Sequence, residues 1–581
     1  MRDYGPPLPG GKAECYLESK PEQRRRNQLP DSVMSEDKYT KAYAERQKHI
    51  DAILASPSRK KVVVAGPGTG KTFLFKKAVE GKSKTLTLTF VNSLVEDLSL
   101  ELCGMSEVRT LHSFARGVLG KAKVFPKLSA VITEDASLLL GQELDFDKLF
   151  QNREDGSQHI AFYKERKNYY DKHYGYSDII FAAVKYLEVN PEKVPVYDQI
   201  VVDEFQDFNK LEVSLIDLLA EKSPILIAGD DDQALYEFKS ASAEHIRQRH
   251  SDDQPDYESF NLPYCSRSTR VIVDAVNDII ANAGENGHLR GRVSKPYIYF
   301  EDQRKDADCT KYPRLVHTSQ FARRIPWFIE NQIAGIAEDV KEKFSVLIIS
   351  PTKTQCRHIA EALRKKGFEN VDYADRQDDK NPVLLDGLRL LLDDDKSNLG
   401  WRIAARCLMG KKEFAELLKE THKEGTKSVH EILGADFKTH VRKMLTALRG
   451  VIKDSDVDKE RLAELLSGTD FDPIRLAKAA LKDEIVGNTH WMGNPGIRKI
   501  PIKITTIQSS KGLASEFVFI THFDELYFVG DSGKGMTDRD ICNFLVALTR
   551  ARKRVVLISS RNEDPTFLTW IKSEWIERLK L

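Results

Sequence analysis

Short, mainly apolar runs alternate with longer amphipathic stretches along most of the chain. The clearest runs are Val62–Ala65, Thr85–Phe90, Gln199–Val202, Ile225–Ala228, Val346–Ile349, Ile502–Ile507, Phe517–Ile520 and Val555–Ile558. Runs of this kind are typical of strands that a parallel sheet buries on both faces. Helical stretches such as Ala42–Leu54 separate most of them, so the pattern predicts an α/β fold with parallel sheets.

Two mainly helical segments interrupt this alternation. One, rich in tyrosine, occupies residues 116–195, and the other, rich in Leu, Ala, Lys and Glu, occupies about 401–495. With 581 residues the chain is too long for a single hydrophobic core. The pattern therefore predicts two α/β bodies, each with a helical insert, behind a mobile N-terminal arm of residues 1–35. The Arg24–Arg26 triplet in that arm is either a solvated tail or a contact with nucleic acid.

Composition narrows the class of protein without identifying a partner. The 89 Lys and Arg residues nearly balance the 88 Asp and Glu residues, so net charge neither supports nor excludes a nucleic-acid partner. The seven cysteines form no Cys-x-x-Cys pair, which favours reduced thiols over a zinc or iron–sulfur site. No apolar stretch is long enough to span a membrane, and the N-terminus lacks an apolar signal core. We therefore expect a cytoplasmic protein without a membrane partner, associated with the nucleoid if its source is prokaryotic.

A glycine-rich turn follows the first apolar run, between a predicted strand and a predicted helix. The turn consists of Gly66, Pro67, Gly68, Thr69, Gly70, Lys71 and Thr72. This context and spacing predict a P-loop, whose backbone N–H groups wrap around phosphate oxygens at a helix N-terminus. Lys71 is expected to reach the β- and γ-phosphates, and the Thr72 hydroxyl to hold Mg²⁺. The strict pattern has glycine where this chain has Ala65.

Two acidic turns follow later apolar runs. Asp203 and Glu204 come directly after a predicted strand, at the carboxyl end where open α/β sheets bind ligands. Asp203 is expected to bind Mg²⁺, and Glu204 to orient and deprotonate an attacking water. In the second turn, Gly229–Gln233, the Gln233 side chain is placed to contact a γ-phosphate. Either turn alone would also suit a solvated surface, but a P-loop upstream favours a nucleotide hydrolase.

Further segments carry a family resemblance. They are Thr89–Asn92, Thr110–Phe114, Leu262–Ser268, Thr506–Leu513 and Val546–Arg552. Together with the P-loop and the acidic turns, and in this order, they resemble the superfamily 1 DNA helicases of the UvrD/PcrA/Rep type. The resemblance covers roughly residues 40–560, and the ordered set is far more specific than any one fragment.

This resemblance implies a fold class and a division of the chain. The fold is α/β, with two RecA-like P-loop NTPase cores built on parallel sheets, each carrying a mainly helical inserted subdomain. The expected first core comprises residues 36–115 and 196–258 and contains the insert 116–195. The expected second core comprises residues 259–400 and 496–581 and contains the insert 401–495.

The resemblance also implies nucleotide contacts, with ATP and Mg²⁺ as cofactors. Arg267 and Arg550 would contact the γ-phosphate from the second core, as arginine fingers do. Gln47 stands where the family has a glutamine that reads adenine, although a plain helix-surface glutamine is the other interpretation. Two positions depart from the family, because Ser266 replaces a tyrosine that stacks on adenine and Ala514 replaces a glutamate that contacts the ribose. These departures leave the adenosine end of the pocket unexplained.

Contacts with nucleic acid follow from the same resemblance. Phe90 and Phe238 match positions on which the bases of a single strand stack, an interaction worth roughly 1–3 kcal/mol per base. The other expected contacts with the strand are Asn92, His112, Tyr236, Lys239 and Ser509. For each aromatic residue, packing in the core is the other interpretation. The expected partner is single-stranded DNA or tailed duplex DNA.

Two functions are consistent with these features. The first is an ATP-dependent DNA helicase or translocase that moves on single-stranded DNA, in the 3′→5′ direction that the resemblance implies. The second is a DNA-stimulated ATPase that translocates or senses DNA within a larger complex and does not separate strands. A second insert shorter than that of the family keeps this alternative open. Either function is compatible with a protein partner that activates or recruits the motor, and with a pathway in repair, replication, plasmid transfer or anti-phage defence.

Overall fold

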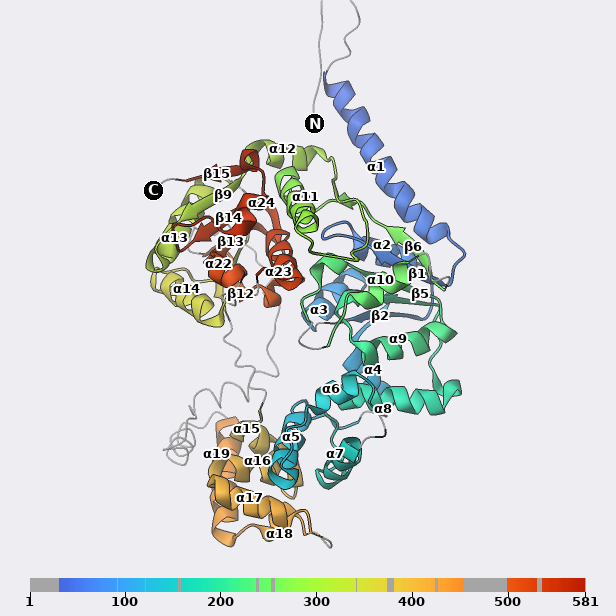
Figure 1. Cartoon of the computed structure of the whole chain (residues 1–581), viewed down its shortest axis with the longest axis vertical. Helices are drawn as coiled ribbons and strands as arrows, with labels where there is room; N and C mark the ends of the chain where they lie inside the picture. The colour runs from blue at the N-terminus through green and yellow to red at the C-terminus, as the bar shows by residue number, and fades with distance from the viewer. Residues whose placement is uncertain are drawn as a thin grey trace, which may run out of the picture.

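Two parallel β-sheets, each flanked by helices, form the two main bodies of the protein (Figure 1). The computed structural model describes residues 31–90, 92–120, 122–154, 156, 158–236, 240–251, 256–340, 342–373, 381–423, 427–452, 499–529 and 535–579. Strands alternate with helices as the apolar runs predict, which confirms the α/β class with two RecA-like cores. No helix in the described part of the chain is long and apolar enough to cross a membrane.

The first sheet has six strands, all parallel, in the order β3-β2-β4-β5-β1-β6. Their bounds are β1 Lys60–Val64, β2 Thr85–Thr89, β3 Glu107–Thr110, β4 Gln199–Val202, β5 Ile225–Gly229 and β6 Glu258–Asn261. β2, β4 and β5 are buried along their whole length, as expected for central strands of a parallel sheet. Because β6 pairs with β1, this sheet extends beyond residue 258, where the first core was expected to end.

Helices of the first core lie against this sheet. They are α1 Asp31–Ala55, α2 Lys71–Val79, α3 Asn92–Glu101, α9 Lys210–Lys222 and α10 Glu244–His250. Residues 31–35 were expected in a mobile arm but begin α1, while Arg24–Arg26 lie outside the described residues. At the start of α9, Asn209 and Glu212 form a capping box, with backbone-to-side-chain distances of 2.9 and 3.1 Å. This box fixes the end of the β4–α9 connection, which carries the acidic turn.

The second sheet has seven strands in the order β11-β12-β10-β13-β14-β9-β15. Their bounds are β9 Leu315–Ser319, β10 Val346–Ser350, β11 Val371–Asp372, β12 Ile502–Thr506, β13 Ser515–Thr521, β14 Ala551–Ser559 and β15 Ile576–Arg578. The accompanying helices are α11 Arg270–Glu285, α12 Gln303–Lys311, α13 Ile325–Asp339, α14 Lys353–Lys365, α22 Glu525–Phe528, α23 Asp538–Leu548 and α24 Thr566–Trp570. The apolar runs did not predict β9, because buried His317 and Thr318 interrupt its apolar character. Two short strands, β7 Tyr264–Cys265 and β8 Ile298–Tyr299, pair with each other in a separate two-stranded parallel sheet.

Each core carries a helical insert, and the two inserts lie together below the cores in Figure 1. The first contains α4 Leu111–Val118, α5 Leu128–Leu140, α6 Phe146–Gln151, α7 Gln158–Tyr169 and α8 Tyr176–Val189. The second contains α15 Leu384–Asp393, α16 Asn398–Leu408, α17 Lys411–Glu420, α18 Val429–Ile432 and α19 Ala435–Ile452. Because α15 and α16 share one hydrophobic cluster with α17 and α19, the second insert begins near Leu384. The expected boundary at residue 401 falls inside α16.

A buried ionic cluster joins the two inserts. The Asp135 carboxylate of α5 accepts hydrogen bonds from Arg166 Nε at 3.0 Å and from Arg402 of α16 at 2.8 Å. The Tyr170 hydroxyl donates to the same carboxylate at 2.5 Å, and Arg166 also donates to the Thr421 carbonyl at 3.2 Å. Asp135, Arg166 and Arg402 are each at most 1% exposed. Burial of paired charge at this junction fixes the inserts against each other, because separating them would leave unpaired ions in the interior.

Candidate nucleotide site between the two cores

The P-loop connects β1 to α2 in a conformation that its glycines permit. Gly68 and Gly70 have φ values of +72° and +100°, a region that side chains rarely adopt. An ideal Cβ at Gly68 would lie only 2.3 Å from the Arg267 Cβ, so this loop also needs glycine for close approach. The Lys71 ammonium donates to the carbonyls of Ala65 at 3.0 Å and Gly66 at 3.3 Å, which holds it over the loop.

The acidic turn follows β4 at the same edge of the sheet. Asp203 is buried, and Glu204 has a left-handed backbone with φ of 54°. Burial and the neighbouring Glu204 raise the pKa of Asp203 to about 7. Burial would also raise the pKa of Glu204, but the ammonium groups of Lys511 and Lys71 outweigh it and hold that pKa at about 2. Gln206 donates to the Glu204 carboxylate at 2.6 Å and so orients it.

Lys511 of the second core reaches across to this acidic turn. Its ammonium lies 2.6 Å from an Asp207 carboxylate oxygen and 3.5 Å from Glu204, and it donates to the Gln233 carbonyl at 2.7 Å. Burial raises the pKa of Asp207 to about 7. The motif at Thr506–Leu513 contains Lys511 but implies no role for it. A single lysine among the small residues of 509–512 is the signal that could have identified it, but its partner lies some 300 residues earlier in the chain.

Two arginines approach the same region from the second core. The Arg550 guanidinium donates to the Gln233 side-chain oxygen at 3.1 Å, and Arg267 lies against the P-loop at Gly68. Burial, followed by the like charge of Arg267, lowers the pKa of Arg550 to about 9. Within the described residues, Arg550 has hydrogen-bond acceptors but no carboxylate at ion-pair distance. Its charge is therefore buried with no direct ion pair to the described residues, although Glu204 acts on it from a greater distance.

These groups line one cavity of about 670 Å³ between the cores. Among its walls are Pro67, Gly68, Gly70, Lys71, Thr72, Asp203, Glu204, Gln233, Arg267 and Arg550. The set combines three cations that form no ion pair with the described residues, backbone N–H groups at a helix N-terminus, a buried carboxylate and a hydroxyl. It fits a triphosphate with a divalent cation, for which Thr72 and Asp203 would be the protein ligands.

The adenine-reading residue expected in α1 does not line this cavity. Gln47 is exposed, and its amide donates to Asp51 at 2.7 Å. The neighbouring Arg46 faces the P-loop instead, since an ideal Cβ on Gly70 would lie 2.6 Å from an Arg46 nitrogen. The Arg46 guanidinium packs 5.1 Å from the centre of the Phe300 ring. The helical phase of α1 therefore brings a different side chain to the loop.

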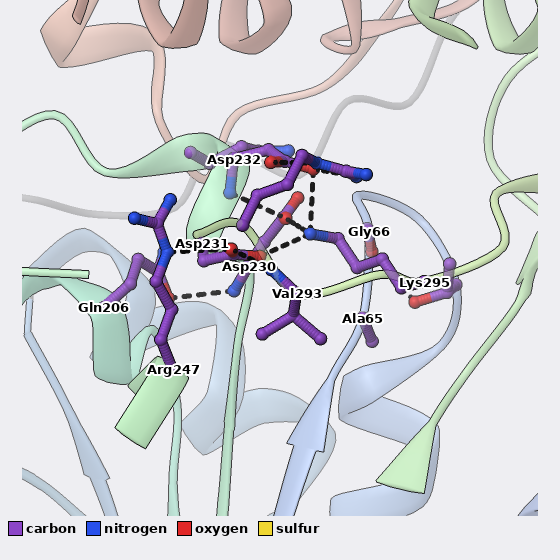
Figure 2. Close-up of polar contacts among 12 residues, drawn as sticks. Ala65, Gly66, Gln206, Asp230, Asp231, Asp232, Arg247, Val293 and Lys295 are labelled. Atoms are coloured by element: carbon purple, nitrogen blue, oxygen red, sulfur yellow. Dashed lines mark hydrogen bonds and ion pairs between the residues drawn. The ribbon is translucent and has the colours of Figure 1, made fainter. Parts of the chain in front are cut away.

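Three consecutive carboxylates after β5 are neutralised by a lysine. Figure 2 shows Lys295 reaching into the turn formed by Asp230, Asp231 and Asp232, with Arg247 on the other side. The Lys295 ammonium lies 3.1, 2.5 and 2.8 Å from the three carboxylates. These carboxylates raise the pKa of Lys295 well above its usual value, although burial opposes that shift. The spacing of the acids would suit a metal ion, but an ammonium group holds that position.

The expected nucleic-acid residues are only partly brought together. Phe90 packs against Tyr236 with ring centres 4.9 Å apart, and the Tyr236 hydroxyl donates to the Gln508 carbonyl at 3.4 Å, next to Ser509. His112 stacks on Tyr176 instead, with ring centres 3.5 Å apart. Asn92 is the first residue of α3, and the structure does not describe its side chain. The two remaining expected contacts, Phe238 and Lys239, lie outside the described residues.

A P-loop, an acidic strand end and arginines from a second parallel-sheet body define the class as a P-loop NTPase with two RecA-like cores. Residues 123–254 match the UvrD/REP helicase N-terminal domain family. DNA helicase II of Escherichia coli is 42% identical over 94 residues, which are 16% of this chain and 13% of that protein. The PcrA helicases of Staphylococcus aureus and Staphylococcus epidermidis are 33% and 32% identical over 115 residues, 19% of this chain and 16% of theirs. The chain is therefore related to the UvrD/PcrA/Rep-type helicases, as its motifs predict, and the matched segments span less than a fifth of those relatives.

Proposed function

We propose that this protein is an ATP-dependent motor that moves along single-stranded DNA. The observation that carries the proposal is the contact between cores at the candidate phosphate site. Arg550 and Lys511 of the second core meet Gln233 at 3.1 and 2.7 Å, and Lys511 also pairs with Asp207. Groups at such a junction sense the γ-phosphate, so binding and hydrolysis would close and open the cleft.

The proposed roles follow from position and charge. Lys71 and the backbone N–H groups of the P-loop hold the phosphates, while Thr72 and Asp203 hold Mg²⁺. Glu204 is ionised and aimed by Gln206, so it orients the attacking water. Arg267 and Arg550 stabilise the charge that develops on the transferred phosphoryl group. ATP is the proposed nucleotide, although Gln47 lies outside the cavity and Ser266 replaces the tyrosine expected there.

A route from the nucleotide to the strand supports movement on DNA. The Lys511 ammonium lies 5.8 Å from the centre of the Tyr236 ring, and Tyr236 packs on Phe90. The residue that pairs with the acidic turn therefore contacts the aromatic residues proposed to stack on bases. A change in the relative position of the two cores would therefore alter the contacts of Lys511 with the acidic turn and with the aromatic residues at the same time. The 3′→5′ direction rests on the family resemblance.

A second function remains open, in which the chain is a DNA-stimulated ATPase subunit that does not separate strands. The docked inserts favour it, because Arg402 of the second insert is bound to Asp135 of the first and less free to act on a duplex. In this case a protein partner would supply strand separation or recruit the motor to its substrate.

Strand displacement on 3′-tailed and 5′-tailed duplexes, measured beside ATPase activity with and without single-stranded DNA, tests these proposals. The first function predicts DNA-stimulated turnover and displacement from the 3′-tailed duplex only. Stimulated turnover without displacement would select the second function, and absence of stimulation would contradict both. Glu204→Gln should bind the strand but lose turnover. Glu221→Gln, at an exposed position of α9, is the matched control and should behave as wild type.

A further inference from the structure

A second cavity, of about 930 Å³, lies where the first core meets both inserts. Phe90 of the first core and His112 of α4 line one side, and residues of α5, α6 and α8 line another. Ile403 and Cys407 of α16 close it from the second insert. The cavity therefore depends on the docking of the inserts, and nothing in the nucleotide mechanism uses it.

An aromatic surface continues from the first core into this cavity. Tyr176, which also lines it, stacks on His112 with ring centres 3.5 Å and planes 28° apart. Tyr176 remains 43% exposed, although it is a large aromatic residue. It is the first residue of α8, whose start is fixed because the Asp178 carboxylate accepts from the Gly175 N–H at 3.2 Å. Phe90 brings to the same cavity the aromatic group that it forms with Tyr236.

The charges of the cavity do not favour a phosphate. Lys127 is paired with Asp386 at 2.8 Å, while Arg402 and Arg406 both pair with Glu134. These three cations already have carboxylate partners, so a phosphate would have to compete with them, and the fourth cation of the lining is the exposed Lys148. Further carboxylates line the same walls, namely Glu143, Asp145, Asp147 and Glu212. The walls thus suit a flat, uncharged face better than a phosphate, and the exposed Tyr176 ring offers the surface for it.

We infer that Tyr176 is a stacking site for a base of single-stranded nucleic acid. A strand that crosses the first core at Phe90 would turn one or more bases into the cavity and keep its phosphates at the mouth. The site lengthens the nucleic-acid track from the core into the first insert. This inference rests on the proposed function, because it requires that a single strand binds across the first core.

The test uses the full chain and a single-stranded oligonucleotide that contains 2-aminopurine. Tyr176→Ala should weaken strand binding about fivefold or more, the effect of losing one stacked base. Quenching of the 2-aminopurine should diminish, and the dependence of affinity on salt should stay unchanged because no charge is removed. Tyr176→Phe should bind as wild type because it keeps the ring. Tyr186→Ala is the matched control, since Tyr186 is 39% exposed on the same helix but does not line the cavity.

The outcomes separate this inference from the proposed function. If the wild-type chain binds no single strand, the proposed function fails. If the wild type binds and Tyr176→Ala binds equally well, the inference is overturned while the function stands. Equal weakening by Tyr176→Phe and Tyr176→Ala would also overturn it, because the hydroxyl group and not the ring would then make the contact. ATP turnover without DNA should be the same in every variant, since Tyr176 lies outside the nucleotide cavity.

Discussion

The nucleotide cleft and the junction between the inserts both bury charge, but they balance it differently. At the junction, burial would lower the pKa of Arg166 and Arg402, yet the Tyr170 hydroxyl and the shared Asp135 carboxylate raise both above the usual value. In the cleft, burial and a neighbouring guanidinium lower the pKa of Arg550 to about 9. The junction therefore stabilises the charged form of its arginines, whereas the cleft disfavours the charged form of Arg550.

This difference distinguishes a structural contact from a binding site. Asp135 supplies the negative charge that the junction needs, so that region is complete without a ligand. In the cleft, no carboxylate of the described residues lies at ion-pair distance from Arg550, and burial raises the pKa of Asp203 to about 7. Perturbed groups of this kind in a cleft are typical of a binding site, where a bound phosphate or metal ion would supply the missing charge partner.

The largest expected effect is on catalysis and concerns Arg550, which forms no ion pair with the described residues. Arg550→Met should lower DNA-stimulated ATP turnover about 10³-fold or more, because arginine fingers contribute on that scale. Steady-state ATPase measurements check it. Arg554→Met is the matched control, since Arg554 lies on β14 just after Arg550 and pairs with Glu577 outside the cavity. Wild-type turnover in Arg550→Met would place the finger elsewhere.

The next effect is on stability, at the junction. Arg402→Met should lower the free energy of unfolding by about 3 kcal/mol, the lower end of the range for a broken buried pair, because Arg166 still holds Asp135. Arg550→Met should cost less, since it leaves no carboxylate unpaired. Urea unfolding of both variants, followed by circular dichroism, checks the order. If Arg550→Met were the more destabilising of the two, the contrast between the regions would be wrong.

A smaller effect is expected in acid, from histidines that are buried in the cores. Burial lowers the pKa of His245, His317 and His522, all in the cores, below the usual 6.5. At these three histidines the unfolded chain binds more protons than the folded one, so their contribution to stability is full above about pH 6.5 and falls as the pH drops below it. Each unit of lowering costs about 1.4 kcal/mol per histidine. Asp203 and Asp207, with pKa values raised to about 7, act in the opposite direction over the same range, so the histidine contribution is measured by difference. His317→Gln should reduce the loss of the urea midpoint between about pH 7.5 and 5 relative to the wild type, and an unchanged loss in this variant would refute the assignment.

The smallest effect is expected at the rim of the junction. Lys127 and Asp386 pair at 2.8 Å, but their side chains remain 28% and 20% exposed. Half-solvated pairs contribute at most about 1 kcal/mol, and less in high salt. Lys127→Met should therefore shift the urea midpoint only slightly. A loss as large as that of Arg402→Met would mean that the rim, and not Asp135, holds the inserts together.

Local motifs made the core of the site predictable, because each depends on a few adjacent residues. The P-loop needs only a strand, glycines and Lys71, and the acidic turn needs only a strand that ends at Asp203. Contacts between distant segments were not predictable in this way. The pairing of Lys511 with Asp207, and of Arg402 with Asp135, joins residues hundreds of positions apart.

The sequence pattern also did not predict which side chain of α1 faces the P-loop, or where the second insert begins. Gln47 and Arg46 are adjacent, and only the packing of α1 decides that Arg46 faces the P-loop. The expected boundary of the second insert at residue 401 lies inside α16, because an amphipathic helix such as Leu384–Asp393 does not show from its sequence which body it packs against. Its packing with α16 assigns it to the insert.

Lys295 has a consequence for how experiments with chelators should be interpreted. A covalently attached cation sits among Asp230, Asp231 and Asp232, in a geometry that a divalent ion could otherwise occupy. EDTA cannot remove this ammonium group, so the structure of the acidic turn does not depend on metal ions in the solution. Loss of activity on chelation would therefore report on the ion that we propose at Thr72 and Asp203, and not on collapse of the neighbouring turn.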